Sequence, residues 1–190
     1  MISPAYQDLA GDEVALVSSH DGGALLRLIA GELDGHRGPG STHTPIVVVH
    51  STLAPGARVE LPWPAETVAV DMLLGNQMPG SERAMAADFL DATGQVLATE
   101  FIALPASWDN RIHDPDRGHQ PLAPIALILR TAETRIRGGG SRQLFVYHQR
   151  IARPAVAAET ASIRLRAVQG APLLLGFTPV PSPPAPREAR

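Results

Sequence analysis

The pattern that most constrains the fold of this chain is a series of short apolar runs separated by turns that contain proline and glycine. A β-branched run at Pro45–His50 is followed by the turn segment Leu53-Ala-Pro-Gly56 and then by the alternating segment Arg58–Leu61. β-Branched residues favour strands, and a proline followed by a glycine favours a turn. Alternation of polar and apolar residues is typical of a strand with one buried face. This succession predicts an antiparallel all-β fold.

Apolar runs elsewhere predict further strands, and one segment predicts a helix. We expect the strands at residues 13–19, 24–32, 68–75, 95–104, 124–131, 143–150, 162–168 and 173–177. Alternation in 24–32 is imperfect, which favours burial on both faces. Residues 81–91 are rich in alanine and begin with a serine that can cap a helix, so a short helix is expected there. The core residues expected from the first third are Leu26, Leu28, Ile46, Val48, Leu53 and Leu61.

Composition and length favour one domain with a proline-rich tail. The chain has 190 residues, 18 Pro, 17 Gly and no Cys, which excludes disulfides, zinc bound by cysteine and thiol nucleophiles. We expect a single domain over residues 1–178 and a tail over 179–190, with disorder from Thr178 onward because of the closely spaced prolines. No apolar run is long enough to cross a bilayer and no signal peptide is visible, so a cytoplasmic protein is expected.

Charge is unevenly distributed along the chain. Residues 1–124 contain 6 Arg and 16 acidic residues, whereas residues 125–190 contain 10 Arg and 3 acidic residues; lysine is absent. A basic half can bind an anionic partner. The arginines are not interleaved with aromatic residues, however, and two halves of one fold can also compensate each other's charge. Both points argue against nucleic-acid binding.

Three segments carry a resemblance to a known family. Tyr6-Gln-Asp-Leu9, the glycine-rich stretch Gly23–Ile46 and the segment Ser51–Pro64 resemble the start of the C-terminal cupin half of the pirin family. The match is strongest over residues 6–64, extends in weaker form to 75 and is unclear beyond. The resemblance implies a cupin-like (jelly-roll) barrel, complete or incomplete. It also implies that iron belongs to the family's N-terminal half, so we expect no cofactor in this chain.

The histidines do not follow the cupin metal motif, which needs two histidines two residues apart, a nearby glutamate and a third histidine. His43 and His50 are seven residues apart, and in one regular strand they would point to opposite faces. Glu60 is separated from His50 by a turn. A metal site formed by His43, His50 and Glu60 is therefore a minor alternative to roles in loops and strand ends.

The densest polar cluster lies in the segment 105–124, which we expect to be a loop. His113, Asp114, Asp116 and His119 can in principle bind a metal, but their spacing matches neither a calcium loop nor a helical zinc motif. A solvated loop is the favoured interpretation. Neither glycine-rich segment has a phosphate-loop ending, and no nucleophile elbow is present, so we expect no catalytic residues.

Two main functions remain open. The first is a pirin-type C-terminal cupin module without its own metal site, truncated or diverged, that acts as a structural or protein-interaction domain. The second is half of an iron-dependent dioxygenase, similar to quercetinase, whose metal-binding N-terminal cupin half is absent from this chain and would act as a partner. A fusion or frameshift product is a third possibility, because the resemblance fades after residue 65. Substrate, partner and oligomeric state do not follow from the sequence.

Overall fold

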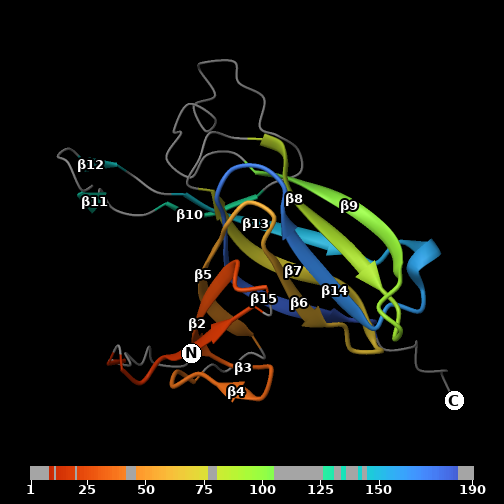
Figure 1. Ribbon diagram of the computed structural model, residues 1–190, viewed down its shortest axis with the longest axis horizontal. Coiled ribbons are helices and arrows are strands. Elements are labelled where there is room, and N and C mark those ends of the chain that lie inside the picture. Colours follow the sequence, from red (N-terminus) through yellow and green to blue (C-terminus); the bar gives the residue numbers. More distant parts are fainter. Residues whose placement is uncertain are drawn as a thin grey trace, which may run out of the picture.

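The computed structural model consists almost entirely of β-strands arranged in antiparallel sheets (Figure 1). The structure describes residues 9–10, 12–19, 21–41, 46–76, 81–104, 126–130, 134–135, 141–142 and 145–183. In this part of the chain the helical residues form one short 3-10 turn, η3 (Ala155–Ala157). The prediction of an antiparallel all-β fold is therefore confirmed.

Two large sheets contain most of the strands. The seven-stranded sheet has the order β1 (Ala15–Ser18), β2 (Ala24–Ala30), β5 (Val47–Leu53), β15 (Pro172–Pro181), β7 (Thr67–Asn76), β13 (Phe145–Ala152) and β10 (Ala126–Arg130). The four-stranded sheet has the order β6 (Arg58–Pro62), β14 (Ser162–Ala167), β8 (Ser81–Leu90) and β9 (Val96–Leu104). Two small hairpins complete the described strands: β3 (Glu32–Leu33) with β4 (His36–Arg37), and β11 (Thr134–Arg135) with β12 (Ser141–Arg142).

Strands from the later part of the chain complete both sheets that the first 64 residues begin. β15 lies between β5 and β7 in the seven-stranded sheet, and β14 pairs with β6 in the four-stranded sheet. All strands expected outside the segment 81–91 are present, with bounds that differ by a few residues. The resemblance stops near residue 75, yet the fold continues through β15.

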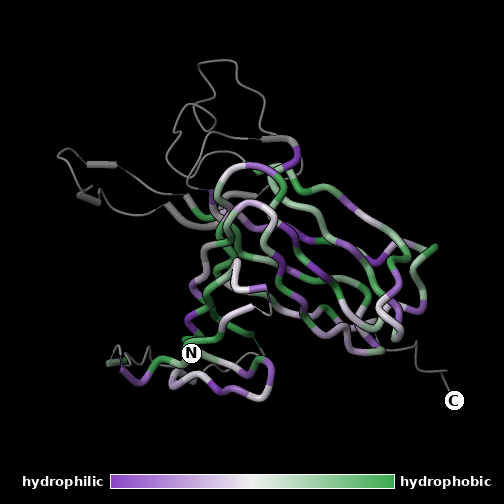
Figure 2. Tube along the Cα trace, viewed as in Figure 1, coloured by the Kyte–Doolittle hydropathy of each residue, from purple (hydrophilic) through white to green (hydrophobic). Residues whose placement is uncertain are grey.

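The turn before β6 forms as its sequence predicts. The Ala57 N–H donates to the Ala54 carbonyl at 2.8 Å, and Gly56 has a φ of +81°, which glycine adopts without strain. In β6 the residues alternate, with Val59 and Leu61 buried and Arg58 and Glu60 exposed. Figure 2 shows similar alternation of hydrophobic and hydrophilic residues along other strands.

One contiguous apolar core joins the two large sheets. Its largest fully buried aliphatic and aromatic side chains come from β2, β5, β6, β7, β8 and β9. Trp63, directly after β6, packs edge-on against Phe89 with ring centroids 5.5 Å apart, and its indole N–H donates to the Thr67 carbonyl at 2.9 Å. Burying residues of this kind stabilises the fold by roughly 1.5–3 kcal/mol each.

The helix expected at residues 81–91 is wrong, because this segment forms strand β8. Ala84 to Leu90 are all buried in β8, which pairs with β14 on one side and β9 on the other. Alanine has the highest intrinsic helix propensity, but propensities are small in free energy, and pairing with a strand on either side overrides them here. The small alanine side chains suit a strand that is covered on both faces.

The strand β5 is shifted by one residue from the expected face. Val49, with 1% of its surface exposed, faces the core, whereas Ile46 and Val48 are only partly buried. The expectation that Ile46 and Val48 form the core is therefore wrong, while Leu26, Leu28, Leu53 and Leu61 are confirmed as buried. A run of three valines offers no contrast that could indicate which face is buried.

Strand β2 is also simpler than expected. Its residues alternate between buried and exposed, with Leu26 and Leu28 inside and Leu25 about half exposed. The expectation of burial on both faces is wrong, because the two apolar residues that break the alternation, Leu25 and Ile29, lie on the outward face and are exposed or only partly buried.

The last strand extends beyond the expected end of the folded part. β15 reaches Pro181, so disorder beginning at Thr178 is wrong for residues 178–181. β5 pairs with β15 only at Gly176 and Phe177. On that side of β15, the residues after Phe177 are paired with no described strand, so a proline such as Pro179, which lacks an N–H, is tolerated there. Residues 184–190 lie outside the described residues, and the division into a domain and a tail stays a prediction.

Candidate functional site

The structure places two of the candidate metal ligands on different sheets and on outer faces. His50 is in the middle of β5 and is exposed beside Arg27 of β2, whereas Val49 and Ser51 on either side of it are buried. Glu60 is on the exposed face of β6 and accepts hydrogen bonds from Ser162 at 2.8 Å and from Arg164 at 3.3 Å. His50 and Glu60 therefore do not converge on a common site.

The remaining candidates lie outside the described residues. These are His43 and the loop residues His113, Asp114, Asp116 and His119. Within the described ranges, no group of three or more His, Cys, Asp or Glu side chains is placed to hold a metal ion. The described part of the chain also contains no helix with the length and hydrophobicity of a membrane span.

Two buried polar side chains, Ser51 and Asn76, form hydrogen bonds with the backbone. The Ser51 hydroxyl donates to the Leu174 carbonyl at 2.9 Å and accepts from the Leu174 N–H at 3.3 Å. Asn76 accepts from the Ala171 N–H at 3.3 Å. These contacts join β5 and β7 to β15 and its preceding turn, so the polar groups are structural.

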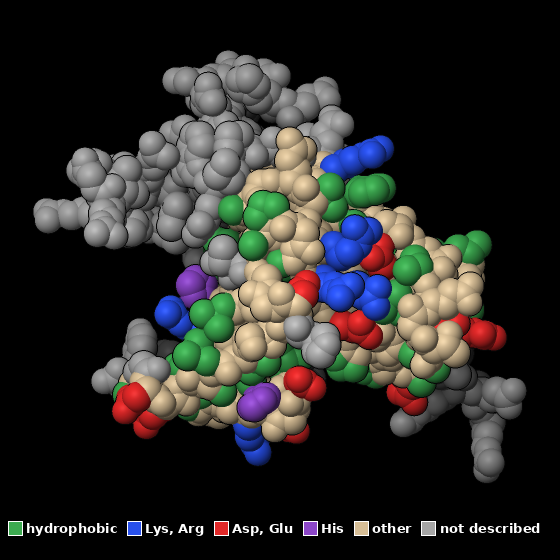
Figure 3. Space-filling view, in the orientation of Figure 1, with side chains coloured by type: hydrophobic (Ala, Val, Ile, Leu, Met, Phe, Trp, Pro, Cys, Tyr) green, Lys and Arg blue, Asp and Glu red, His purple; other side chains and the backbone are tan. Residues whose placement is uncertain are grey.

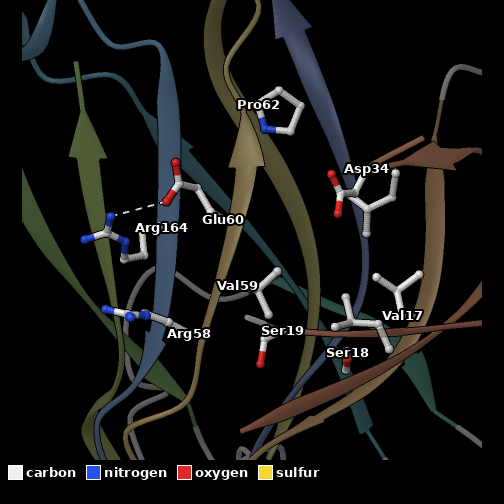
Figure 4. Close-up of a pocket in the computed structure, with 11 residues that line it drawn as sticks. Val17, Ser18, Ser19, Asp34, Arg58, Val59, Glu60, Pro62 and Arg164 are labelled. Atoms are coloured by element: carbon white, nitrogen blue, oxygen red, sulfur yellow. Dashed lines mark hydrogen bonds and ion pairs between the residues drawn. The ribbon is translucent and has the colours of Figure 1, made fainter. Parts of the chain in front are cut away.

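A pocket of about 550 Å³ opens between the edge strands of the two large sheets (Figure 4). β6 forms one wall, and β1 with the turn between β3 and β4 forms the opposite wall. Figure 4 shows Asp34, Ser18 and Val17 across the pocket from β6, on the side opposite to Arg164. The inner lining is apolar and includes Val17, Leu26, Leu33 and Val59. The rim is polar and includes Arg58 and Glu60.

The rim of this pocket carries charges of both signs. The Arg58 guanidinium lies 3.6 Å from the Asp21 carboxylate, and its side chain is 53% exposed. Ser19 and the Gly23 N–H donate to the same Asp21 carboxylate and hold its pKa below the ordinary value, with burial acting in the opposite direction. Asp34 stands in the left-handed region, with φ of +49°, at the tip of the β3–β4 turn.

The outer face of the four-stranded sheet is a network of ion pairs, visible in Figure 3 as neighbouring blue and red side chains. Asp88 is almost fully buried and accepts from Arg166 at 2.5 and 3.0 Å and from Thr99 at 2.8 Å. Burial raises the pKa of Asp88, but hydrogen bonds from Arg166 and Thr99 outweigh it, and the pKa is lowered. Nearby, Arg83 stacks over the Phe101 ring at 4.6 Å.

A second cluster lies on the outer face of the seven-stranded sheet. Asp71 of β7 accepts two hydrogen bonds from Arg150, at 2.7 and 2.6 Å, and lies 3.0 Å from His148 of β13. The hydrogen bonds from Arg150 lower the pKa of Asp71 although partial burial opposes them, and His148 adds to the lowering. The cluster joins neighbouring strands, and none of the pocket-lining residues belongs to it.

No sequence pattern predicts the pocket. Its lining comes from β1, β2, the β3–β4 turn, β6 and β14, which are far apart in the chain. The Asp34-Gly35 turn is the one local signal, and by itself it indicates only a loop.

Comparisons with known proteins support a relationship over part of the chain. No family model matches. The chain is 36% identical to a Pseudomonas aeruginosa protein named "Putative quercetin 2,3-dioxygenase" over 83 residues, which are 43% of this chain. It is 33% identical to a pirin-like protein of Arabidopsis thaliana over 64 residues, which are 34% of this chain. These matches span 29% and 20% of the relatives' lengths.

Solved structures are similar at a lower level. A quercetin 2,3-dioxygenase from Acinetobacter baumannii aligns with a TM-score of 0.44 and 14% identity, over 92% of this chain and 39% of that one. The protein GK1651 from Geobacillus kaustophilus aligns with a TM-score of 0.43 and 17% identity, over 95% of this chain and 49% of that one. The sequence matches, which agree with the resemblance of the first third, show that this chain is related to the pirin-like cupin proteins.

Proposed function

We propose that this chain is a pirin-type C-terminal cupin module that acts as a structural or protein-interaction domain without a metal site of its own. The observation that carries the proposal is the packing of the space between the sheets. Most inward positions of β2, β5, β6, β7 and β14 are occupied by apolar side chains that are almost completely buried, and the inward polar residues Ser51 and Asn76 bond to the backbone. An iron site would need several inward nitrogen or oxygen ligands at this place.

The described residues do not fit the iron that the family resemblance implies. His50 and Glu60 point outward from two different sheets, and the core between the sheets is apolar. The role left for such a domain is to bind a protein partner through its surface. On the grounds of its sequence, we also propose that it acts in the cytoplasm.

The test is an oxygen-consumption assay with quercetin and added Fe(II), run on the purified chain. We expect a rate equal to that of Fe(II) and quercetin without protein. Protein-dependent turnover that a chelator abolishes would contradict the proposal, because it would require a working metal site in this chain.

The second candidate is half of a pirin-type dioxygenase, and the name of the Pseudomonas aeruginosa relative is what favours it. In that case an N-terminal cupin half supplies the iron and this domain closes the site. Mixing the chain with the separately produced N-terminal half of that relative tests this. Quercetin turnover that appears only in the mixture would establish the second candidate, and no turnover would leave the interaction module as the function.

A further inference from the structure

The edge of strand β6 that borders the pocket is paired with no described strand. The Trp63 N–H donates to the Ala161 carbonyl at 2.9 Å, and the Ala167 N–H donates to the Ala57 carbonyl at 2.9 Å. Hydrogen-bonded positions alternate along an antiparallel strand, so the odd-numbered residues of β6 bond to β14. The backbone groups of Arg58 and Glu60 therefore point away from β14, to the side on which Figure 4 shows the pocket.

The pocket combines three features that suit an added strand. A row of backbone groups at a spacing of two residues forms one wall, which an extended chain can match. The floor contains Val17, Leu26, Leu33 and Val59, which can receive one apolar side chain. The volume of about 550 Å³ is within the range of ligand sites in proteins.

A carboxylate already occupies part of this edge. Asp21 lies 3.6 Å from the Arg58 guanidinium and also receives a hydrogen bond from the Arg58 backbone. Its other oxygen is held by Ser19 and by the Gly23 N–H, within its own turn. Asp21 thus marks the position that an acidic side chain of a ligand would take.

We propose that the edge of β6 is a docking site for an extended peptide segment of a partner protein, with the pattern basic–apolar–acidic. This inference rests on the proposed interaction function and names its site. In an antiparallel arrangement the basic residue lies opposite Glu60, where it joins Ser162 and Arg164 as a partner of that carboxylate. The apolar residue enters the pocket opposite Val59, and the acidic residue replaces Asp21 at Arg58. Residues opposite each other share a face, so the order Arg58, Val59, Glu60 selects this pattern.

Binding of a peptide with fluorescein on its N-terminus, fluoresceinyl-Thr-Lys-Val-Asp-Thr-amide, measured by fluorescence polarisation tests the proposal. We expect a Kd below about 1 mM for the full chain, as for a weak peptide–domain contact. N-methylation of the lysine removes the N–H that would donate to Glu60, so it should abolish binding. N-methylation of the valine, whose N–H points away from β6, should leave the Kd within about twofold.

Two variants of the chain should change the affinity in opposite directions. Arg58→Glu replaces the exposed cation and should raise the Kd at least about tenfold, whereas Asp21→Asn removes the competing charge and should lower the Kd. The asparagine side chain keeps an oxygen for Ser19 and Gly23, so the turn is retained. Arg27→Glu, an exposed change outside the pocket lining, is the matched control and should leave the Kd unchanged.

Three results would overturn the proposal. They are an absence of binding at about 1 mM peptide, equal affinity for both N-methylated peptides, and a dimer of the chain that Arg58→Glu dissociates while no peptide binds. The last would mean that a second copy occupies the edge. None of them depends on iron, so failure here is distinct from failure of the proposed function, which would appear as metal-dependent turnover.

Discussion

At the scale of single residues, the fold depends on which side chain of a repetitive run faces the core. Val49 is buried and Val48 is only partly buried, although the two residues are identical and adjacent. The difference in burial between these two valines shows which face of β5 is turned toward the core.

We predict that Val49→Asp destabilises the domain by more than about 3 kcal/mol, because it removes a buried apolar side chain and places a charge in the core. Val48→Asp, on the partly exposed face, should cost clearly less. Urea unfolding followed by circular dichroism measures both. Equal losses for the two variants would show that the assigned register of β5 is wrong.

The carboxylates held by arginines predict how stability changes with pH. The pKa of Asp71 and of Asp88 is lowered in the folded state, so the unfolded state binds protons first as the pH falls. Their stabilisation is fully present above the ordinary aspartate pKa and is lost as the pH falls through the lower, folded values. The free energy of unfolding should therefore decrease below about pH 4.

Asp88→Asn should make this acid-induced decrease shallower, because one of the two carboxylates no longer titrates. Asp12→Asn, at an exposed position, is the control and should keep the slope of the wild-type chain. An unchanged slope for Asp88→Asn would mean that the contact with Arg166 does not persist in solution.

At the scale of elements, β15 is the strand that binds the two ends of the seven-stranded sheet together. It pairs with β7 from Pro172 to Pro181 and with β5 at Gly176 and Phe177. The Ser182 N–H also donates to the Glu66 carbonyl at 2.8 Å. The end of this strand therefore contributes to the sheet despite its prolines.

Truncation after Phe177 should lower the Tm by several degrees, because it removes the pairing of residues 178–181 with β7. Truncation after Pro183 keeps every described residue and should leave the Tm unchanged, as expected of a proline-rich tail. Differential scanning calorimetry of both chains gives the comparison. Identical Tm values for the two truncated chains would show that the end of β15 does not contribute to stability.

The sequence predicts a strand correctly where charged and apolar residues alternate clearly, and it fails where neighbouring residues are alike. β6 is predicted correctly because charged and apolar residues alternate in Arg58–Leu61. The helix predicted in place of β8 is wrong because its alanines carry a local preference that pairing on both sides overrides. The pocket could not be predicted, because it arises from the meeting of two sheet edges and not from any local motif.

At the scale of the whole molecule, the two sheets share one core. Trp63, which follows β6, is buried against Phe89 of β8, while Met72 and Leu74 of the seven-stranded sheet belong to the same cluster. Side chains from both sheets must therefore separate when either sheet unfolds.

We predict that the domain unfolds in one cooperative transition. In a Trp108→Phe variant, fluorescence reports on Trp63 alone, and its urea midpoint should coincide with the midpoint of far-ultraviolet circular dichroism. Separate midpoints would show that the four-stranded sheet unfolds independently of the rest.

The central claim is that an apolar core occupies the space between the sheets and that this chain works as a module without its own metal. The most direct test is elemental analysis of the full chain after anaerobic incubation with excess Fe(II) and desalting. We predict far less than one iron per chain, because the described inward positions offer too few ligands. About one iron per chain, lost when His50 or His43 is replaced by alanine, would contradict the account.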